Sequence, residues 1–158
     1  MSPMRPQPPE TAPTESPRPH RVLVVDDEVH LRVFLATAFR TAGYEALMAP
    51  DGDKGLHLAR RQRPDLITLD LMMPGQGGVN MYQGLQEDPE LARIPVMVIS
   101  AVEAGTFRHT LRTLAAARGV ALPMPAAYVE KPPNPDQLLG LAAELLGGVA
   151  RTADRFTI

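Results

Sequence analysis

The sequence lacks several residue types and patterns, and each absence excludes a class of protein. None of its 158 residues is cysteine, so the chain can form neither disulfides nor thiolate metal sites. Its formal net charge of −2 supplies no basic surface for nucleic acid. No apolar run approaches the roughly 20 residues that a membrane-spanning helix needs. We therefore expect a cytoplasmic protein that binds neither nucleic acid nor membrane.

The two ends of the chain differ in composition from its middle. Residues 1–20 hold seven of the 17 prolines and no apolar stretch, which excludes a signal peptide and predicts a disordered, Pro-rich tail. A plain extension is favoured there over a docking motif. Residues 149–158 read as a second tail, with no room for a helix-turn-helix output domain. A single domain over residues 21–148 remains.

Within residues 21–148, short apolar runs alternate with amphipathic stretches. The runs predict strands, and the stretches predict helices, with Asp51 and Asn134 as helix caps and Gly119 as a helix stop. Strands separated by helices pair in parallel through right-handed crossovers. The predicted fold is therefore α/β: a doubly wound, five-stranded parallel sheet with five helices in a three-layer sandwich. The predicted strands cover residues 22–25, 44–48, 66–69, 95–99 and 127–130.

Polar residues directly follow four of these apolar runs. Asp26 and Asp27 follow the first strand, Asp70 the third, Ser100 the fourth and Lys131 the fifth. In an open parallel sheet, ligands bind at the carboxyl ends of the strands. Because the first and third strands should be neighbours, we expect three carboxylates to converge there.

Such a group of carboxylates indicates a metal site and a reaction. Three nearby anions repel one another, and a hard divalent cation such as Mg²⁺ relieves that repulsion through oxygen ligands. An added lysine, a hydroxyl and a lone Asp nucleophile suit phosphoryl transfer, in which positioning and charge neutralisation supply most of the catalysis. Taken alone, "DDE" after a strand is more often a solvated loop. The agreement among several strand ends favours function.

Four stretches together carry a resemblance to a known family. They are "VLVVDDE", "PDLITLDLMMPG", "VMVISA" and "YVEKP", and they span most of residues 20–148. The chain resembles a two-component response-regulator receiver domain. The resemblance implies a flavodoxin-like sheet of order 2-1-3-4-5 and a phospho-acceptor switch rather than an enzyme. It also implies a histidine kinase or phosphotransfer protein as donor and a downstream protein as the recipient of the signal.

The resemblance assigns roles residue by residue. Asp70 is then the phospho-acceptor and a Mg²⁺ ligand, Asp27 a direct ligand, and Asp26 a ligand partly through water. Met72 offers its backbone carbonyl to the metal. The remaining implied roles belong to Ser100 as the hydroxyl that turns toward the phosphoryl group, Lys131 as its cationic partner, Tyr128 as an aromatic switch, and Lys131-Pro132 as a cis peptide.

The sequence departs from the family pattern in two places. The interval from Ser100 to Lys131 is long, and Pro123 and Pro125 predict an extended loop there, either specific to one partner or tolerated slack. The loop falls in the face of the fourth helix, fifth strand and fifth helix that the resemblance implies for a homodimer. Met72 and Val102 should flank the path of an attacking water without orienting it. We hypothesise slow self-hydrolysis of the phosphorylated form.

Two other functions fit parts of the pattern. A Mg²⁺-dependent aspartyl phosphatase of the haloacid dehalogenase group would need a second Asp where Met72 stands. A receiver-like interaction module that is never phosphorylated would not need the intact acidic and lysine residues. The histidines have no ligand spacing and are expected at the surface: His20, His30, His57 and His109.

Overall fold

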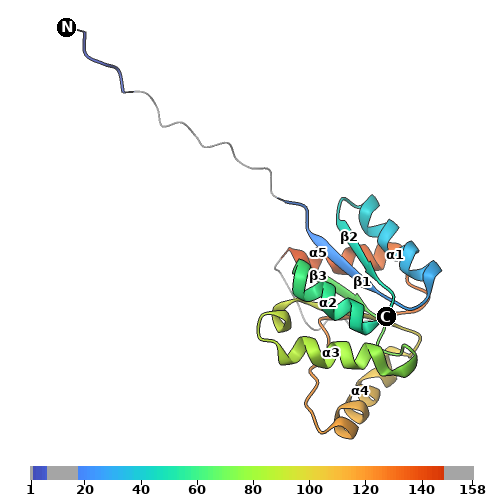
Figure 1. The fold of residues 1–158 in the computed structure, drawn as a ribbon. Helices are drawn as coiled ribbons and strands as arrows, with labels where there is room; N and C mark the ends of the chain where they lie inside the picture. Colours follow the sequence, from blue (N-terminus) through green and yellow to red (C-terminus); the bar gives the residue numbers. More distant parts are fainter. Residues whose placement is uncertain (1, 7–17, 148–158) are drawn as a thin grey trace.

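The computed structural model describes residues 2–6 and 18–147, within which five strands alternate with five α-helices (Figure 1). The predicted tail at 1–20 lies largely outside the described residues, and the one at 149–158 lies wholly outside them. The strands are β1 (Arg21–Val25), β2 (Glu45–Ala49), β3 (Leu66–Leu69), β4 (Val96–Ser100) and β5 (Ala127–Glu130). The helices are α1 (Val29–Thr41), α2 (Gly52–Gln62), α3 (Gly77–Glu87), α4 (Ala104–Arg118) and α5 (Pro135–Leu146).

The strands form one parallel sheet in the order β2-β1-β3-β4-β5, which confirms the predicted fold. Helices α1 and α5 cover one face, and α2, α3 and α4 cover the other, with α4 on the side of α3 away from α2 (Figure 1). Alternate residues of a strand face opposite sides of a sheet. Val24 accordingly packs toward α1 and α5, whereas Val25 packs toward α2 and α3. β1 thus contributes side chains to the core on both faces of the sheet.

Local signals in the sequence place several helix ends. The side chain of Asp51 accepts a hydrogen bond from the Lys54 amide at 2.8 Å and caps α2. Asn134 caps α5 with Pro135 in its first turn. Gly119 ends α4 in a left-handed conformation with φ of 65°, which glycine adopts without steric cost. These three predicted boundaries are confirmed.

Several boundaries differ from the prediction by one or two residues. The second strand begins at Glu45 rather than Tyr44, because the Tyr44 amide donates to the Phe39 carbonyl at the end of α1 instead of joining the sheet. The sequence predicts the third helix over residues 79–87, but this helix begins at Gly77, two residues earlier. Glycine is a poor helix former, so the sequence gives no sign of that first turn.

Residues 119–126 form the expected long connection between α4 and β5. The hydroxyl of buried Tyr82 donates to the Pro123 carbonyl at 2.7 Å and ties this connection to α3. Burial raises the pKa of Tyr82. A cleft of about 430 Å³ lies beneath the connection, beside Pro95 and Val96 at the start of β4. The cleft therefore opens at the amino-terminal ends of the strands, opposite the carboxyl ends that carry the predicted site.

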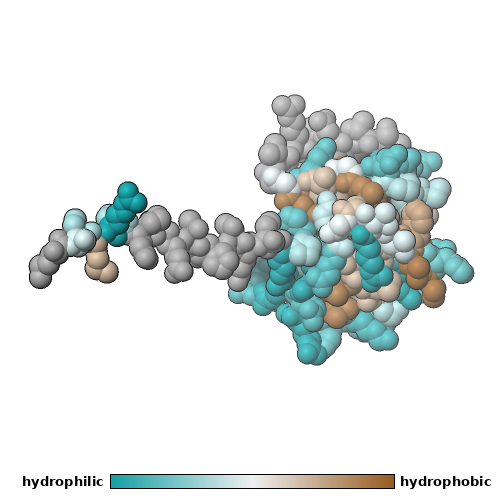
Figure 2. All heavy atoms as spheres, turned by 90° about the horizontal axis from the view of Figure 1, so that it is seen from above, coloured by the Kyte–Doolittle hydropathy of each residue, from teal (hydrophilic) through white to brown (hydrophobic). Residues whose placement is uncertain are grey.

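The surface of the domain mixes polar and apolar residues. Figure 2 shows brown apolar side chains in separate small groups among teal polar ones on the visible face. Three large apolar side chains on α1 are exposed, namely Val29, Val33 and Phe34. Among the described residues, no helix has the length and apolar character to cross a membrane.

Candidate functional site

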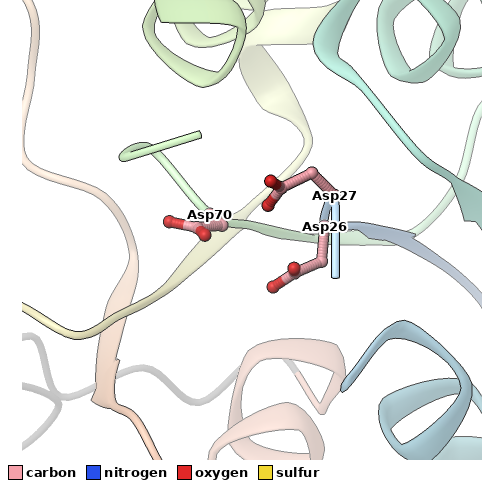
Figure 3. Close-up of side chains that lie close together, drawn as sticks. All are labelled: Asp26, Asp27 and Asp70. Carbon is pink, nitrogen blue, oxygen red and sulfur yellow. The ribbon is translucent and has the colours of Figure 1, made fainter. Parts of the chain in front are cut away.

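The acidic residues meet where β1 and β3 end side by side. Val25 pairs with Leu69, and the Asp70 amide continues the ladder by donating to the Val25 carbonyl at 3.2 Å. Asp26, Asp27 and Asp70 each place one carboxylate oxygen within 4.8 Å of the others. Figure 3 shows Asp26 and Asp27 leaving the end of β1 in different directions, with Asp70 beside them. The predicted convergence of three carboxylates is confirmed.

Asp26 is the most deeply buried member of this group. Its side chain is 1% exposed, and one oxygen accepts the Glu28 amide at 2.9 Å. The other oxygen lies 3.2 Å from Nζ of Lys131. Burial raises the pKa of Asp26, although the Glu28 amide and Lys131 act in the opposite direction. The carboxylate thus needs compensating positive charge in a site that excludes most water.

Asp70 is held from both of its carboxylate oxygens. Oδ1 accepts the Met72 amide at 2.9 Å, and Oδ2 accepts Nζ of Lys131 at 2.9 Å. The side chain is 8% exposed, so it remains reachable from solvent at one edge. The carboxylate therefore has a fixed orientation at the mouth of the site.

Lys131 supplies the positive charge opposite these acids. Burial opposes its ammonium form, but the hydrogen bond and charge of Asp70, with those of Asp26, outweigh burial and raise the pKa of Lys131. Its backbone amide donates to the Ser100 carbonyl at 2.8 Å, and its peptide bond to Pro132 is cis. One ammonium group therefore serves two carboxylates.

Ser100 and Tyr128 form a second layer next to Lys131. Ser100 is fully buried, and its Oγ accepts the Val102 amide at 3.2 Å. The Tyr128 ring is also buried, with its centroid 4.4 Å from that of Phe107. Its hydroxyl donates to the Val102 carbonyl, and burial raises the pKa of Tyr128. Val102 is thus bonded from both sides.

Sequence reasoning missed two residues that support the site. Gly78 lies so close to the end of β3 that a Cβ there would sit 2.2 Å from the Asp70 carbonyl oxygen. Glu130 accepts the Ala104 amide at 2.7 Å and joins β5 to the start of α4. Both contacts link residues distant in the chain, so local patterns could not reveal them. The four histidines are exposed, as predicted.

The acidic group has the chemistry of a hard-cation site. All of its side-chain donors are carboxylate oxygens, and Asp27 is exposed, so a bound ion would keep access to water. Mg²⁺ prefers such ligands and retains several waters. The cluster could hold a metal ion of this kind.

A comparison with protein families decides the identity of the domain. A family model described as response regulator receiver domain matches residues 22–142. The chain belongs to the response regulator receiver domain family. Receiver domains are the signalling domains of two-component systems, in agreement with the resemblance of the four sequence stretches.

Two known relatives are similar to part of this chain. The probable transcriptional regulator ycf27 of Galdieria sulphuraria is 34% identical over 121 residues, which cover 77% of this chain and 43% of that protein. Response regulator PleD of Caulobacter vibrioides is 44% identical over 84 residues, 52% of this chain and 18% of PleD. The chain thus spans less than half the length of these relatives.

The chemotaxis response regulator CheY4 of Vibrio cholerae shares the receiver fold. Its structure matches with a TM-score of 0.68 at 25% identity, over 82% of this chain and 100% of that chain. The fold of this receiver domain is therefore that of the CheY-like, flavodoxin-like class.

Proposed function

We propose that this receiver domain is a phospho-acceptor switch of a two-component phosphorelay, phosphorylated on Asp70 by a histidine kinase or phosphotransfer protein. The observation that carries the proposal is the 2.9 Å contact between Asp70 Oδ2 and Lys131 Nζ, beside the carboxylates of Asp26 and Asp27. A nucleophilic carboxylate, a cation and a metal-binding group in one place are the parts that phosphoryl transfer needs.

The transfer forms one bond and breaks one. A carboxylate oxygen of Asp70 attacks the phosphorus of the donor, and the bond from phosphorus to the donor nitrogen or oxygen breaks. The leaving group keeps the electron pair, and the product is an acyl phosphate. Lys131 then pairs with a phosphoryl oxygen, and the hydroxyl of Ser100 turns toward the phosphoryl group.

In this proposal Mg²⁺ would be held by Asp26, Asp27, Asp70 and the backbone carbonyl of Met72, with Asp26 acting partly through water. When bound, the ion would neutralise negative charge on the phosphoryl oxygens. The chain's own part is to keep three carboxylates converged and Lys131 opposite them. The all-oxygen donor set supports this assignment.

The output of the switch is contact with a downstream protein. Tyr128 reports the state of the site by its inward or outward placement, and the face formed by α4, β5 and α5 serves as the partner or homodimer surface. We place this process in the cytoplasm, where a histidine kinase presents its phosphoryl group.

We further propose a long-lived phosphorylated state. Met72 is 47% exposed beside Asp70, and Val102 lies next to Ser100 in the following connection. Neither side chain can orient water by hydrogen bonding, so hydrolysis of the acyl phosphate should be slow. A half-life of only seconds in the purified protein would refute this.

Incubation of the purified chain with acetyl phosphate and Mg²⁺ tests the main proposal. Intact-mass measurement should show one added phosphoryl group, lost in Asp70→Asn and retained in Asp53→Asn, which changes an exposed acid on α2. Omission of Mg²⁺ should slow the gain. No gain would favour an unphosphorylated interaction module, and turnover of phosphate esters would favour a phosphatase.

A further inference from the structure

Helix α4 begins without a cap from its own sequence. Glu103 occupies the N-cap position but makes no side-chain capping bond, and the first turn holds no acidic residue. The free amide of Ala104 instead donates to Oε1 of Glu130, at the end of β5, at 2.7 Å. A carboxylate at a helix N-terminus is stabilised by the helix dipole and forms a charge-assisted hydrogen bond. The cap of α4 is therefore supplied by a neighbouring strand.

The same strand holds the segment just before the helix. Tyr128 lies two residues before Glu130, on the same face of β5, and its hydroxyl donates to the Val102 carbonyl. Its ring also packs against Phe107 in the first two turns of α4. The connection from Val102 to Ala104 is thus fastened to β5 at both of its ends.

This fastening reaches the buried hydroxyl of the site. The Val102 amide donates to Ser100 Oγ at 3.2 Å, so the position of the connection bears directly on where the hydroxyl is held. Lys131, which follows Glu130 in sequence just past the end of β5, contacts Asp70. Two adjacent residues at the end of β5 therefore contact the start of α4 and Asp70.

We propose that Glu130 is a positioning residue for phosphoryl transfer to Asp70, because its hydrogen bond to the start of α4 sets the connection that holds Ser100. The inference rests on the proposed function, since it concerns the rate of transfer to Asp70. Glu130 itself touches neither the acceptor nor the metal ligands. Its effect passes through Ala104 and Val102 to the hydroxyl.

The first test measures the rate of phosphorylation by acetyl phosphate in Mg²⁺. Glu130→Ala should slow the reaction about fivefold, the effect expected when one helix cap is lost. Glu130→Gln retains an acceptor oxygen and should remain within about twofold of the parent, since a cap amide largely replaces a cap carboxylate. Glu144→Ala removes an exposed acid from α5 and should change nothing. Equal rates for Glu130→Ala and the parent would overturn the inference.

A second variant separates positioning from helix stability. Ala104→Pro removes the amide donor while leaving a residue that the first helical position accepts, and Glu103 already has the extended backbone that precedes proline. The helix then needs no cap there, but the link to β5 is gone. We expect Ala104→Pro to slow phosphorylation about as much as Glu130→Ala, and the double variant to be no slower than either. An unchanged rate in Ala104→Pro would mean that Glu130 serves stability alone and would overturn the inference.

A Ser100→Ala background tests the route of the effect. There Glu130→Ala should cause no further slowing, although it should lower the melting temperature as it does in the parent. A full additional loss of rate would show that Glu130 does not act through Ser100. If the parent itself gains no phosphoryl group on Asp70, the proposed function fails as well, whereas a parent that reacts and a Glu130→Ala variant of equal rate refute the positioning role alone.

Discussion

The two connections that leave the site are built in opposite ways. The β3–α3 connection follows Asp70 and is fixed by backbone packing, with Gly78 against the Asp70 carbonyl and Gly52 against the carbonyl of Gly77. The β4–α4 connection follows Ser100 and is fixed by side chains that reach across from β5. Backbone atoms in close contact cannot separate without moving whole elements, whereas a side chain can exchange one hydrogen bond for another.

This difference suggests a division of labour within the domain. Asp70, the proposed acceptor, lies on a rigid support, which favours an accurate geometry for the proposed transfer. The hydroxyl is mounted on a support whose bonds can be broken one at a time. Phosphorylation of Asp70 would therefore move the β4–α4 connection before it moved α3.

The largest expected effect comes from disturbing the rigid support. Gly78→Ala places a methyl group where the Asp70 carbonyl oxygen already lies, at 2.2 Å from the ideal Cβ position. Backbone must shift, so we expect a loss of about 3 kcal/mol in the free energy of unfolding, at the upper end for overpacking. Urea denaturation measures the loss, and phosphorylation of the folded fraction should fall with it.

The matched control is Gly140→Ala in α5. Nothing lies within 4 Å of a Cβ at that exposed position. The substitution should raise the unfolding free energy by about 0.5–1 kcal/mol, because alanine favours a helix over glycine. Similar losses at both positions would contradict the view that close backbone packing fixes the β3–α3 connection.

A smaller effect is expected on the lifetime of the phosphorylated state. Met72→Asn on the first connection and Val102→Asn on the second each introduce an amide that can hydrogen-bond an attacking water. Either should shorten the half-life on the order of tenfold, less than a fully positioned general base contributes. Intact-mass measurement of the phosphorylated protein over time gives this half-life. If only Met72→Asn shortens the half-life, the attacking water approaches from the side of the β3–α3 connection.

Side-chain contacts also hold the C-terminal end of α4, and they can be removed there. Arg118 donates to Gln83 Oε1 at 3.0 Å and to Gln76 Oε1 at 2.9 Å, and so ties α4 to α3. Arg118→Met should cost about 1 kcal/mol of unfolding free energy, a typical net value for hydrogen bonds of this kind. Amide hydrogen exchange should quicken in α4 and not in α3. The control Arg112→Met, on an exposed position of α4, should leave exchange unchanged.

The smallest effect concerns β3 itself. Thr68 is buried, and among the described residues its hydroxyl has no hydrogen-bond partner. Thr68→Val removes that unsatisfied group at nearly constant shape and should stabilise the domain by about 0.5–1 kcal/mol. Thermal unfolding measures the gain, and the phosphorylation rate should be unchanged. A destabilised variant would mean that the hydroxyl has a partner, such as a bound water.

The sheet and the acidic group could be predicted because their signals are local. Val22–Val25 is a buried strand by composition alone, and the position of Asp26 at its end follows from chain continuity. Asp51 and Asn134 carry recognisable cap chemistry. Parallel pairing then brings these strand ends together without any further information.

The supports of the site could not be predicted because they are long-range. Nothing near Gly78 in sequence shows that the Asp70 carbonyl will occupy the space of its missing side chain. Glu130 and Ala104 are 26 residues apart, and Arg118 meets Gln76 across 42 residues. Such contacts depend on the angles between packed elements, which periodicity does not specify.

The connection of residues 119–126 lies near the amino-terminal ends of the strands, remote from the acidic group. The Tyr82 hydroxyl holds it through a hydrogen bond to the Pro123 carbonyl. Extra residues at exposed Ala121 would cost only about 0.6 kcal/mol for each doubling of loop length. A fluorescent tag or affinity handle inserted here would thus stay away from the carboxylates, and its effect on partner binding would show whether this loop belongs to the partner surface.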